Sequence, residues 1–247
     1  LMAFLLVIAI LCWIKPELGP RGPITSWSEK AHAMLGAIPI ISVVLVTIGG
    51  IYGGFFSPVE AAGVGAGLVI LYGMITRQLT LAAIREAGRD SVVTTATVML
   101  ILISAHLINP FLALSHIPTV VGEALAALHL GVYGTLAVIL LIYMVLGCFL
   151  EGFAMLVLTL PIFFPVVLAL GIDPIWFGVL VVLTLEMGLI SPPVGLNVFI
   201  VKSVAPAVPL GRIFVGVLPF WLAMLATLIL LVAFPQISLM LPNTMIR

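Results

Sequence analysis

Long apolar runs, separated by short polar segments, dominate the chain. The runs lack the alternation over about ten residues that is typical of membrane β-strands. Four of them are long enough for an α-helix to cross a bilayer, which takes roughly 17–25 residues. They cover residues 32–56, 60–76, 91–114 and 213–234. The pattern therefore predicts an all-α polytopic membrane protein.

Shorter segments lie before and between these runs. Residues 1–14 are apolar but too short for a complete span, so we assign them to the end of a preceding transmembrane helix. Residues 15–34 include three prolines and are expected to form a loop, with a short amphipathic helix from Ser26. Residues 77–90 and 118–130 are expected to be amphipathic connectors. In the first, Leu81, Ile84 and Ala87 lie roughly on one helical face, which suits a helix against the bilayer.

The second half of the chain contains two interrupted apolar segments. Residues 131–170 form two apolar arms around Glu151, which are either two complete spans or a re-entrant hairpin. Residues 174–204 begin a helix after Asp173 and meet the sequence Ser-Pro-Pro-Val-Gly at 191–195. Two prolines and a glycine in close succession cannot continue a regular α-helix, so this segment is expected to be a broken helix.

Composition supports a membrane protein and excludes several other classes. The chain has 247 residues, of which 64% are hydrophobic and only 7% are charged, whereas an average soluble domain has about 25% charged residues. Nine basic and nine acidic residues give no basic field, so no nucleic-acid partner is expected. Neither H-E-x-x-H nor G-x-S-x-G occurs in the sequence, and we therefore expect no enzyme.

The basic residues indicate an orientation. If residues 131–170 leave one side of the membrane and return to it, eight of the nine lysines and arginines lie on one side and only Arg247 lies on the other. Basic loops favour the cytoplasmic side. We therefore expect the loops at 15–34 and 77–90 to be cytoplasmic and the C-terminus to be external.

Residues 57–60 and the glycines around them have structural explanations. Ser57, followed by Pro58 and Glu60, is typical of a helix N-terminus with a capping hydroxyl and a favourable charge in the first turn. The glycines between positions 49 and 67 have the spacing of closely packed helices. Neither feature needs a ligand.

The broken segment is the strongest candidate for a functional site. Unpaired backbone groups in hydrocarbon cost several kcal/mol each, so a break is tolerated where it lines a cavity or coordinates a ligand. Unwound carbonyls, with the side-chain oxygens of Ser191 and Asn197, would form hard ligands suited to Na⁺, and the following half-helix offers its positive N-terminus to an anion. The structural alternative is a proline kink or a loop between two short helices.

Two acidic residues within apolar sequence are further candidates. Glu186 either coordinates a cation or carries a proton, or it hydrogen-bonds to a neighbouring helix. Glu151 is either the tip of a re-entrant hairpin or a loop carboxylate in water. Gly147 and Gly152 would let such a tip turn closely, and Thr159 would help to interrupt the second arm.

Four blocks of the sequence resemble the large, DctM-like membrane subunit of tripartite ATP-independent periplasmic (TRAP) transporters. Residues 49–62, GGIYGGFFSPVEAA, resemble that family's GGIYGGxFTPTEAA block, and residues 185–199 resemble its GLITPPVGLNLF block. Residues 146–161 resemble its second hairpin, and residues 234–242 resemble its C-terminal end. Ser191 replaces a usual threonine but keeps the hydroxyl. The resemblance covers the C-terminal half of the family's subunit.

The resemblance implies one half of an inverted-repeat transporter in which a transport domain moves as an elevator against a scaffold. On this pattern, residues 35–130 are scaffold-type helices with amphipathic connectors. Residues 131–204 are the transport region, with a re-entrant hairpin at 131–170 and a broken helix at 174–204. Residues 205–247 form the last transmembrane helix and an external tail.

The resemblance also implies a function. The chain would be the permease subunit for Na⁺-coupled uptake of an organic acid, a carboxylate, handed over by a periplasmic binding protein, with no cofactor other than the coupling ion. A small four-helix membrane subunit and the N-terminal half of the same subunit are the other expected partners, in the bacterial cytoplasmic membrane. The alternatives are an elevator-type anion/Na⁺ symporter without a binding protein, and a non-transporting structural membrane subunit.

The site residues follow from the resemblance and from the break together. The Na⁺ ligands would be Ser191, Gly195 and Asn197. The complete ion- and substrate-binding set is expected to be Glu186, Gly188, Ser191, Pro192, Pro193, Gly195 and Asn197. The hairpin gate is expected to be Gly147, Glu151, Gly152 and Thr159.

Overall fold

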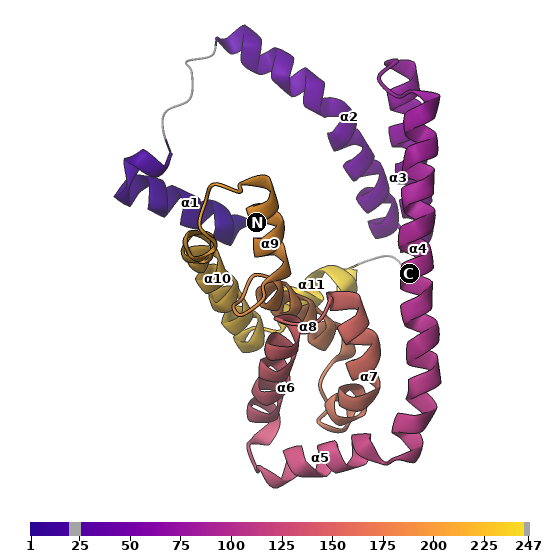
Figure 1. Ribbon diagram of the computed structural model, residues 1–247, viewed down its shortest axis with the longest axis vertical. Coiled ribbons are helices and arrows are strands. Elements are labelled where there is room, and N and C mark those ends of the chain that lie inside the picture. Colours follow the sequence, from indigo (N-terminus) through magenta and orange to yellow (C-terminus); the bar gives the residue numbers. More distant parts are fainter. Residues whose placement is uncertain (20–25, 245–247) are drawn as a thin grey trace. The chain divides into compact units, whose positions relative to one another are not determined.

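The structure is a computed structural model that describes residues 1–19 and 26–244, with their side chains except at positions 18, 31–33 and 113. Every regular element in this part of the chain is a helix (Figure 1). Five of these helices are long and apolar enough to cross a membrane, which confirms the prediction of an all-α polytopic membrane protein. Arg21, in the expected N-terminal loop, and Arg247 lie outside the described residues.

The helices follow one another through short connections. In chain order they are α1 (Met2–Ile14), the 3₁₀ turn η1 (Pro16–Leu18), α2 (Trp27–Tyr52), α3 (Pro58–Ile75), α4 (Leu81–Leu114), α5 (Ile117–Ala127), α6 (Gly131–Gly147), α7 (Gly152–Ala169), α8 (Pro174–Leu189), α9 (Leu196–Val204), α10 (Leu210–Ala233) and α11 (Gln236–Thr244).

The chain divides into two compact units. One unit comprises residues 1–19 and 99–240, and the other comprises residues 20–98 and 241–247. The first therefore contains both interrupted segments predicted from the sequence, and the second is built around α2 and α3. Helix α4 contributes residues to both units.

Side-chain caps fix where two of the helices begin. Glu60 accepts a hydrogen bond from the Ser57 N–H at 2.8 Å and donates its own N–H to the Ser57 hydroxyl, so the expected cap of α3 is confirmed. At the start of α8, Asp173 accepts hydrogen bonds from the N–H groups of Ile175 and Trp176. Such caps stabilise a helix by about 1 kcal/mol.

Two helices are longer than the sequence pattern indicates. A capping box of Ser26 and Glu29 starts α2 at Trp27, so the end of the expected loop at 15–34 is helical and continues directly into the span. Helix α4 joins the expected surface connector at 81–90 to the span that follows. The sequence has no proline at that junction, and Gly88 costs a helix only about 1 kcal/mol, so nothing there ends the helix.

The glycines between positions 49 and 67 have different roles. A Cβ on Gly65 would lie 3.0 Å from the Thr47 side chain of α2, so close packing of α2 and α3 explains that glycine. Gly54 has φ +74° in the turn between these helices, a conformation that favours glycine. A Cβ on Gly49, Gly63 or Gly67 would meet nothing within 4 Å.

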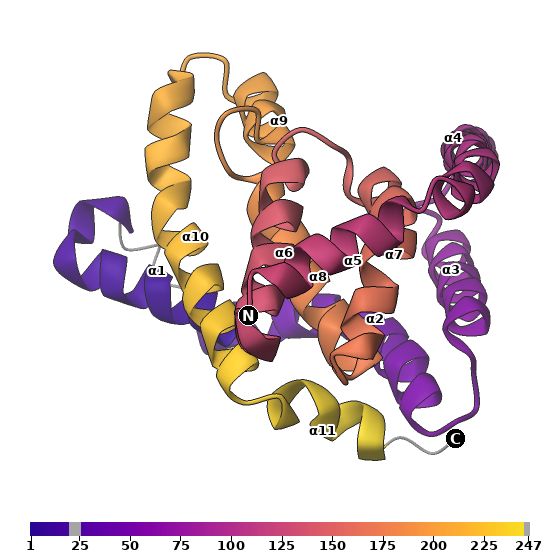
Figure 2. The same cartoon turned by 90° about the horizontal axis from the view of Figure 1, so that it is seen from below.

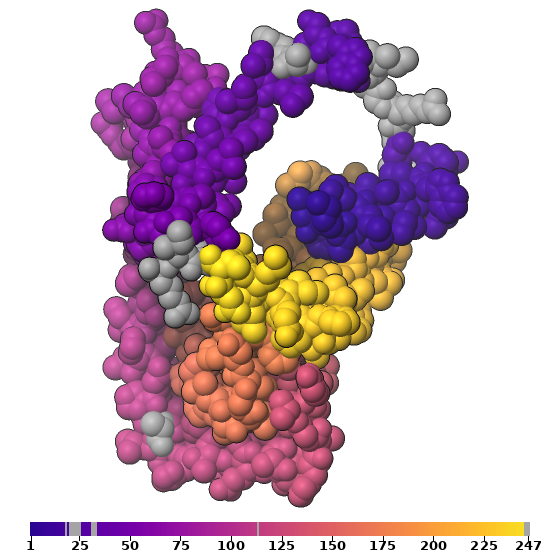
Figure 3. Space-filling model, turned by 180° about the vertical axis from the view of Figure 1, so that it is seen from behind, coloured from indigo at the N-terminus to yellow at the C-terminus, as the bar shows by residue number. Residues whose placement is uncertain are grey.

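The unit that contains the interrupted segments is built around α6 and α8. Helix α6 packs along α8, α10 packs on α8 beside it, and α7 closes against both α6 and α8 (Figure 2). Helix α5 packs against α7 and lies below it in the view of Figure 3. Tyr143 is fully buried at the centre, with its ring 5.5 Å from that of Phe163 and 6.3 Å from that of Phe177.

Backbone contact between two glycines brings α6 and α8 together. A Cβ on Gly188 would lie 2.7 Å from the carbonyl carbon of Gly147 and 3.0 Å from the Met144 carbonyl oxygen. Real Cβ atoms essentially never come this close to backbone. The contact places the end of the first hairpin arm directly against the end of α8, where the helix breaks.

Replacement of Gly188 by alanine should therefore separate the two helices. We expect Gly188→Ala to destabilise the protein by about 1–3 kcal/mol, the usual cost of overpacking. Gly178→Ala is the matched control, because it lies on the same helix and its Cβ would meet nothing within 4 Å. Thermal unfolding of the purified protein in detergent measures the difference. Equal midpoints for the two variants would show that the contact does not constrain the helices.

Candidate functional site

The hairpin of α6 and α7 turns at residues 148–151. The N–H groups of residues 148–150 donate to carbonyls in the last turn of α6, which keeps the turn tight. The exposed Glu151 is the N-cap of α7, and its two carboxylate oxygens accept the N–H groups of Phe153 and Ala154, each at 3.0 Å. The structure thus gives Glu151 a capping role.

A buried hydrogen bond ties the two arms of the hairpin together. The Thr159 hydroxyl oxygen lies 2.9 Å from the hydroxyl of Tyr143 on the other arm, and it also donates to the Met155 carbonyl. Thr159 therefore holds the arms together. Of the two glycines near the tip, Gly147 is required by the contact with α8, whereas a Cβ on Gly152 would meet nothing within 4 Å.

The predicted break lies between α8 and α9. The Ser191 N–H donates to the Gly188 carbonyl at 2.9 Å, which closes the last turn of α8. Pro192 and Pro193 follow, joined by a cis peptide bond, and prolines have no N–H to donate. Gly195 then has φ +61° and begins α9. The backbone between the two helices is thus irregular, as the sequence predicts.

The hydroxyl of Ser191 is buried and held from two sides. It donates to the Met187 carbonyl at 2.6 Å and accepts the indole N–H of Trp221, on α10, at 2.8 Å. Ser191 is only 7% exposed. A hydroxyl oxygen has two lone pairs, and one of them remains available.

The second half of the break leaves polar groups without partners. Among the described residues, no hydrogen-bond partner is found for the half-buried Asn197 side chain, and α9 has no side-chain N-cap. Gly195 is enclosed, since a Cβ there would lie 3.0 Å from the Ser191 carbonyl oxygen and 3.1 Å from the Phe214 ring. The first N–H groups of a helix without a cap are suited to an anion.

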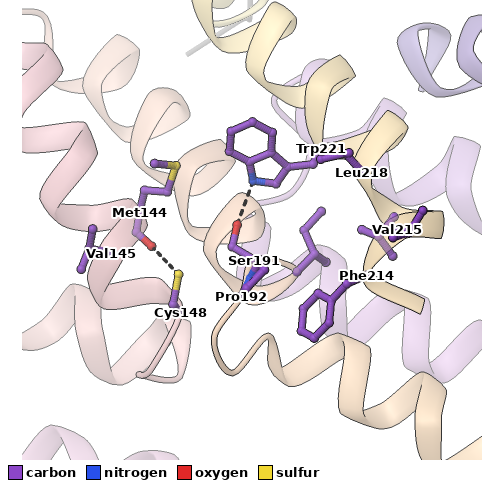
Figure 4. A pocket seen from close by; sticks show the side chains of 11 residues that line it. Met144, Val145, Cys148, Ser191, Pro192, Phe214, Val215, Leu218 and Trp221 are labelled. Carbon is purple, nitrogen blue, oxygen red and sulfur yellow. Dashed lines mark hydrogen bonds between the residues drawn. The ribbon is translucent and has the colours of Figure 1, made fainter. Parts of the chain in front are cut away.

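A cavity of about 520 Å³ lies beside the break (Figure 4). Its walls come from the end of α6, the start of the break and α10, and its lining includes Met144, Cys148, Ser191, Pro192, Phe214 and Trp221. The lining is mainly apolar, and its polar groups are the Ser191 hydroxyl, the Trp221 indole and the Cys148 thiol. The thiol donates to the Met144 carbonyl at 3.2 Å.

Glu186 does not line the Ser191 cavity but a neighbouring one, and the two cavities share Ile190 and Val217 in their walls. The exposed Glu186 side chain lines this second cavity of about 450 Å³, together with Phe4 of α1 and Phe220 and Thr227 of α10. The structure therefore brings the hairpin end at Gly147 to the break, and it places the Glu186 carboxylate in the adjoining cavity.

The ligand types at the break fit a hard cation. The described residues contain no group of three or more histidine, cysteine, aspartate and glutamate side chains that could hold a metal ion. The break instead offers the remaining lone pair of Ser191, the amide of Asn197 and unwound carbonyl oxygens. Neutral oxygen ligands of this kind suit Na⁺ at a discontinuous helix.

Sequence reasoning missed Trp221, Phe214 and Tyr143. Trp221 lies within the long apolar helix α10, and an indole buried there needs an acceptor for its N–H. That requirement is a signal, but it does not identify the acceptor, because Ser191 lies in the break, 30 residues earlier in the sequence.

Comparison with known proteins identifies the family. Residues 1–237 match the family described as "Tripartite ATP-independent periplasmic transporter, DctM component". The chain belongs to this family. The prediction of a DctM-like subunit is thereby confirmed, and so is the expectation of a multi-pass membrane component of a transporter and not an enzyme.

Several curated TRAP permeases are similar to the chain along most of its length. The C4-dicarboxylate TRAP transporter large permease protein DctM of Pseudomonas aeruginosa is 34% identical, over 98% of this chain and 56% of that protein. The sialic acid permease SiaM of Vibrio cholerae is 32% identical, over 90% and 52%. The ectoine/5-hydroxyectoine permease UehC of Ruegeria pomeroyi is 30% identical, over 90% and 52%. The chain thus spans about half the length of these relatives.

The capping geometry of Glu151 can be tested in the assembled TRAP permease. We expect Glu151→Ala to lower the free energy of unfolding by about 1 kcal/mol, because the first N–H groups of α7 lose their acceptors. Glu151→Asn should retain most of the stability, since asparagine is a good N-cap. Thermal unfolding measures both variants.

Glu123→Ala, which removes another exposed carboxylate in the same unit, is the control and should have little effect. If Glu151→Asn is as defective as Glu151→Ala, the carboxylate charge is required, and the cap does not explain the residue.

Proposed function

We propose that the chain is the C-terminal half of the large permease subunit of a TRAP transporter, and that it contributes one half of a Na⁺-coupled binding site for an organic anion. Ser191, Gly195 and Asn197 would hold the ion. The main support for this proposal is the break between α8 and α9, which lies in apolar sequence. Ser191 and Asn197 place a side-chain oxygen on each side of it.

Two features favour a binding site over a proline kink. A kink in hydrocarbon is stable when its polar groups are satisfied within the chain. Here the Ser191 side of the break is satisfied, whereas among the described residues the Asn197 amide has no hydrogen-bond partner and no side chain caps α9. A cation bound by Asn197 together with Ser191, and an anion near the α9 N-terminus, would satisfy these groups.

The hairpin is proposed to re-enter the membrane and to form the gate, with Gly147, Glu151, Gly152 and Thr159. Phe149 and Leu150, at its turn, are 56% and 37% exposed. Apolar residues at an exposed turn suit a hydrocarbon environment better than water.

The elevator motion and the partners belong to the same proposal. An inverted second repeat, a small four-helix membrane subunit and a periplasmic binding protein would complete the transporter, with the basic loops in the cytoplasm. The family name, which describes a tripartite periplasmic transporter, supports the number of components. The substrates named for the relatives differ, from C4-dicarboxylates to sialic acid and ectoine, so we propose only an organic anion for this chain.

Substitution of the break residues tests the ion site. In the complete transporter in liposomes, we expect uptake to require Na⁺ and not K⁺. Ser191→Ala and Asn197→Ala should each raise the half-saturating Na⁺ concentration by about tenfold or more, the equivalent of about 1.4 kcal/mol for one lost ligand. Initial uptake rates at a series of Na⁺ concentrations provide the measurement.

Ser203→Ala removes an exposed hydroxyl from α9 and serves as the matched control, with an expected unchanged Na⁺ dependence. Unaltered Na⁺ dependence in the Ser191 and Asn197 variants would favour a structural role for the break. Uptake that continues without the binding protein would favour the binding-protein-independent symporter.

A further inference from the structure

Helix α10 contacts the break at two points. The ring of Phe214 packs over Gly195, where it would lie 3.1 Å from a Cβ. Seven residues later, on the same face of α10, Trp221 donates its indole N–H to the Ser191 hydroxyl at 2.8 Å (Figure 4). One helix thus holds both ends of the irregular segment.

The two hydrogen bonds of Ser191 determine in which direction its hydroxyl oxygen can bind a further ligand. The hydroxyl donates its proton to the Met187 carbonyl at 2.6 Å, and one lone pair of its oxygen accepts the Trp221 N–H. Only one lone pair remains, and its direction is fixed by the other two bonds. Without the indole, the oxygen would have two unused lone pairs and a less defined direction.

We propose that Trp221 is a positioning residue of the ion site, which orients the Ser191 hydroxyl so that its remaining lone pair points to the coupling cation. This inference rests on the proposed Na⁺ coupling. Trp221 does not bind the ion itself. It acts through Ser191, and it makes the hydroxyl a ligand that needs no reorientation when the ion arrives.

Trp176 provides an internal comparison. It lies on α8, and its indole N–H donates to the Leu231 carbonyl of α10 at 2.9 Å. Both tryptophans therefore donate an indole hydrogen bond to a distant part of the chain, Trp176 from α8 to α10 and Trp221 from α10 to the break. Only the bond of Trp221 ends on a side chain of the break. Substitution of Trp176 therefore shows the effect of losing an indole hydrogen bond that supports packing alone, and substitution of Trp221 adds the loss of contact with Ser191.

The test measures Na⁺-dependent uptake by the complete transporter in liposomes. Trp221→Phe keeps an aromatic ring but removes the N–H. We expect it to raise the half-saturating Na⁺ concentration about three- to tenfold, the range for one lost hydrogen bond, with the maximal rate at saturating Na⁺ retained. Trp176→Phe should leave the half-saturating concentration unchanged. In a Ser191→Ala background, Trp221→Phe should have no further effect on it, because the two residues act through one bond.

Two results would overturn the assignment. One is that Trp221→Phe lowers the maximal uptake rate but leaves the half-saturating Na⁺ concentration unchanged. The other is that Trp221→Phe raises the half-saturating Na⁺ concentration by the same factor in a Ser191→Ala background as in the unaltered transporter. Loss of Na⁺ dependence in the unaltered transporter is a separate outcome, since it would overturn the proposed function before any variant is made.

A fluorescence measurement tests the same assignment if the Trp221→Phe variant fails to fold. In a transporter with Trp221 as its single tryptophan, Na⁺ should change the indole emission, with the same midpoint as uptake, and K⁺ should not. Ser191→Ala should abolish the change. An emission that does not respond to Na⁺ while uptake does would show that Trp221 is not coupled to the ion.

Discussion

The backbone contact between Gly147 and Gly188 is the constraint on which the site depends. No side chain fits between the two residues, so the end of α6 and the end of α8 meet without any intervening layer. A displacement of the hairpin must therefore move the end of α8 or separate the contact. This coupling follows from packing alone, because densely packed backbones cannot deform continuously. The hairpin and the break are thus packed directly against each other.

The distribution of hydrogen bonds across the break distinguishes it from a kink. Its first half is closed, since Ser191 bonds to Met187 and Trp221 and its N–H completes the last turn of α8. In its second half, the described residues offer no hydrogen-bond partner to the Asn197 side chain and no side-chain cap to α9. In an apolar environment such open groups are costly. A segment that is rigid on one side and unsatisfied on the other has the properties expected of a preformed ligand site.

The sequence predicts helices and their limits best where a local signal exists. Ser57 with Glu60, and Asp173, mark two helix starts correctly, and the double proline marks the break. The junction at residue 90 was predicted wrongly as a boundary, because a change from an amphipathic to an apolar pattern changes the environment of a helix without ending it. The bond from Trp221 to Ser191 was not predictable, since it depends on how two helices pack.

Neither acidic candidate lines the Ser191 cavity, and this bears on which ion the proposed site would select. Glu151 uses both carboxylate oxygens to cap α7, and Glu186 lines a neighbouring cavity. The oxygens of the proposed ion ligands are a hydroxyl, an amide and carbonyls, none of which takes up a proton near neutral pH. A carboxylate can exchange a metal cation for a proton, whereas these neutral oxygens cannot. This chemistry supports Na⁺ over a proton as the proposed coupling ion.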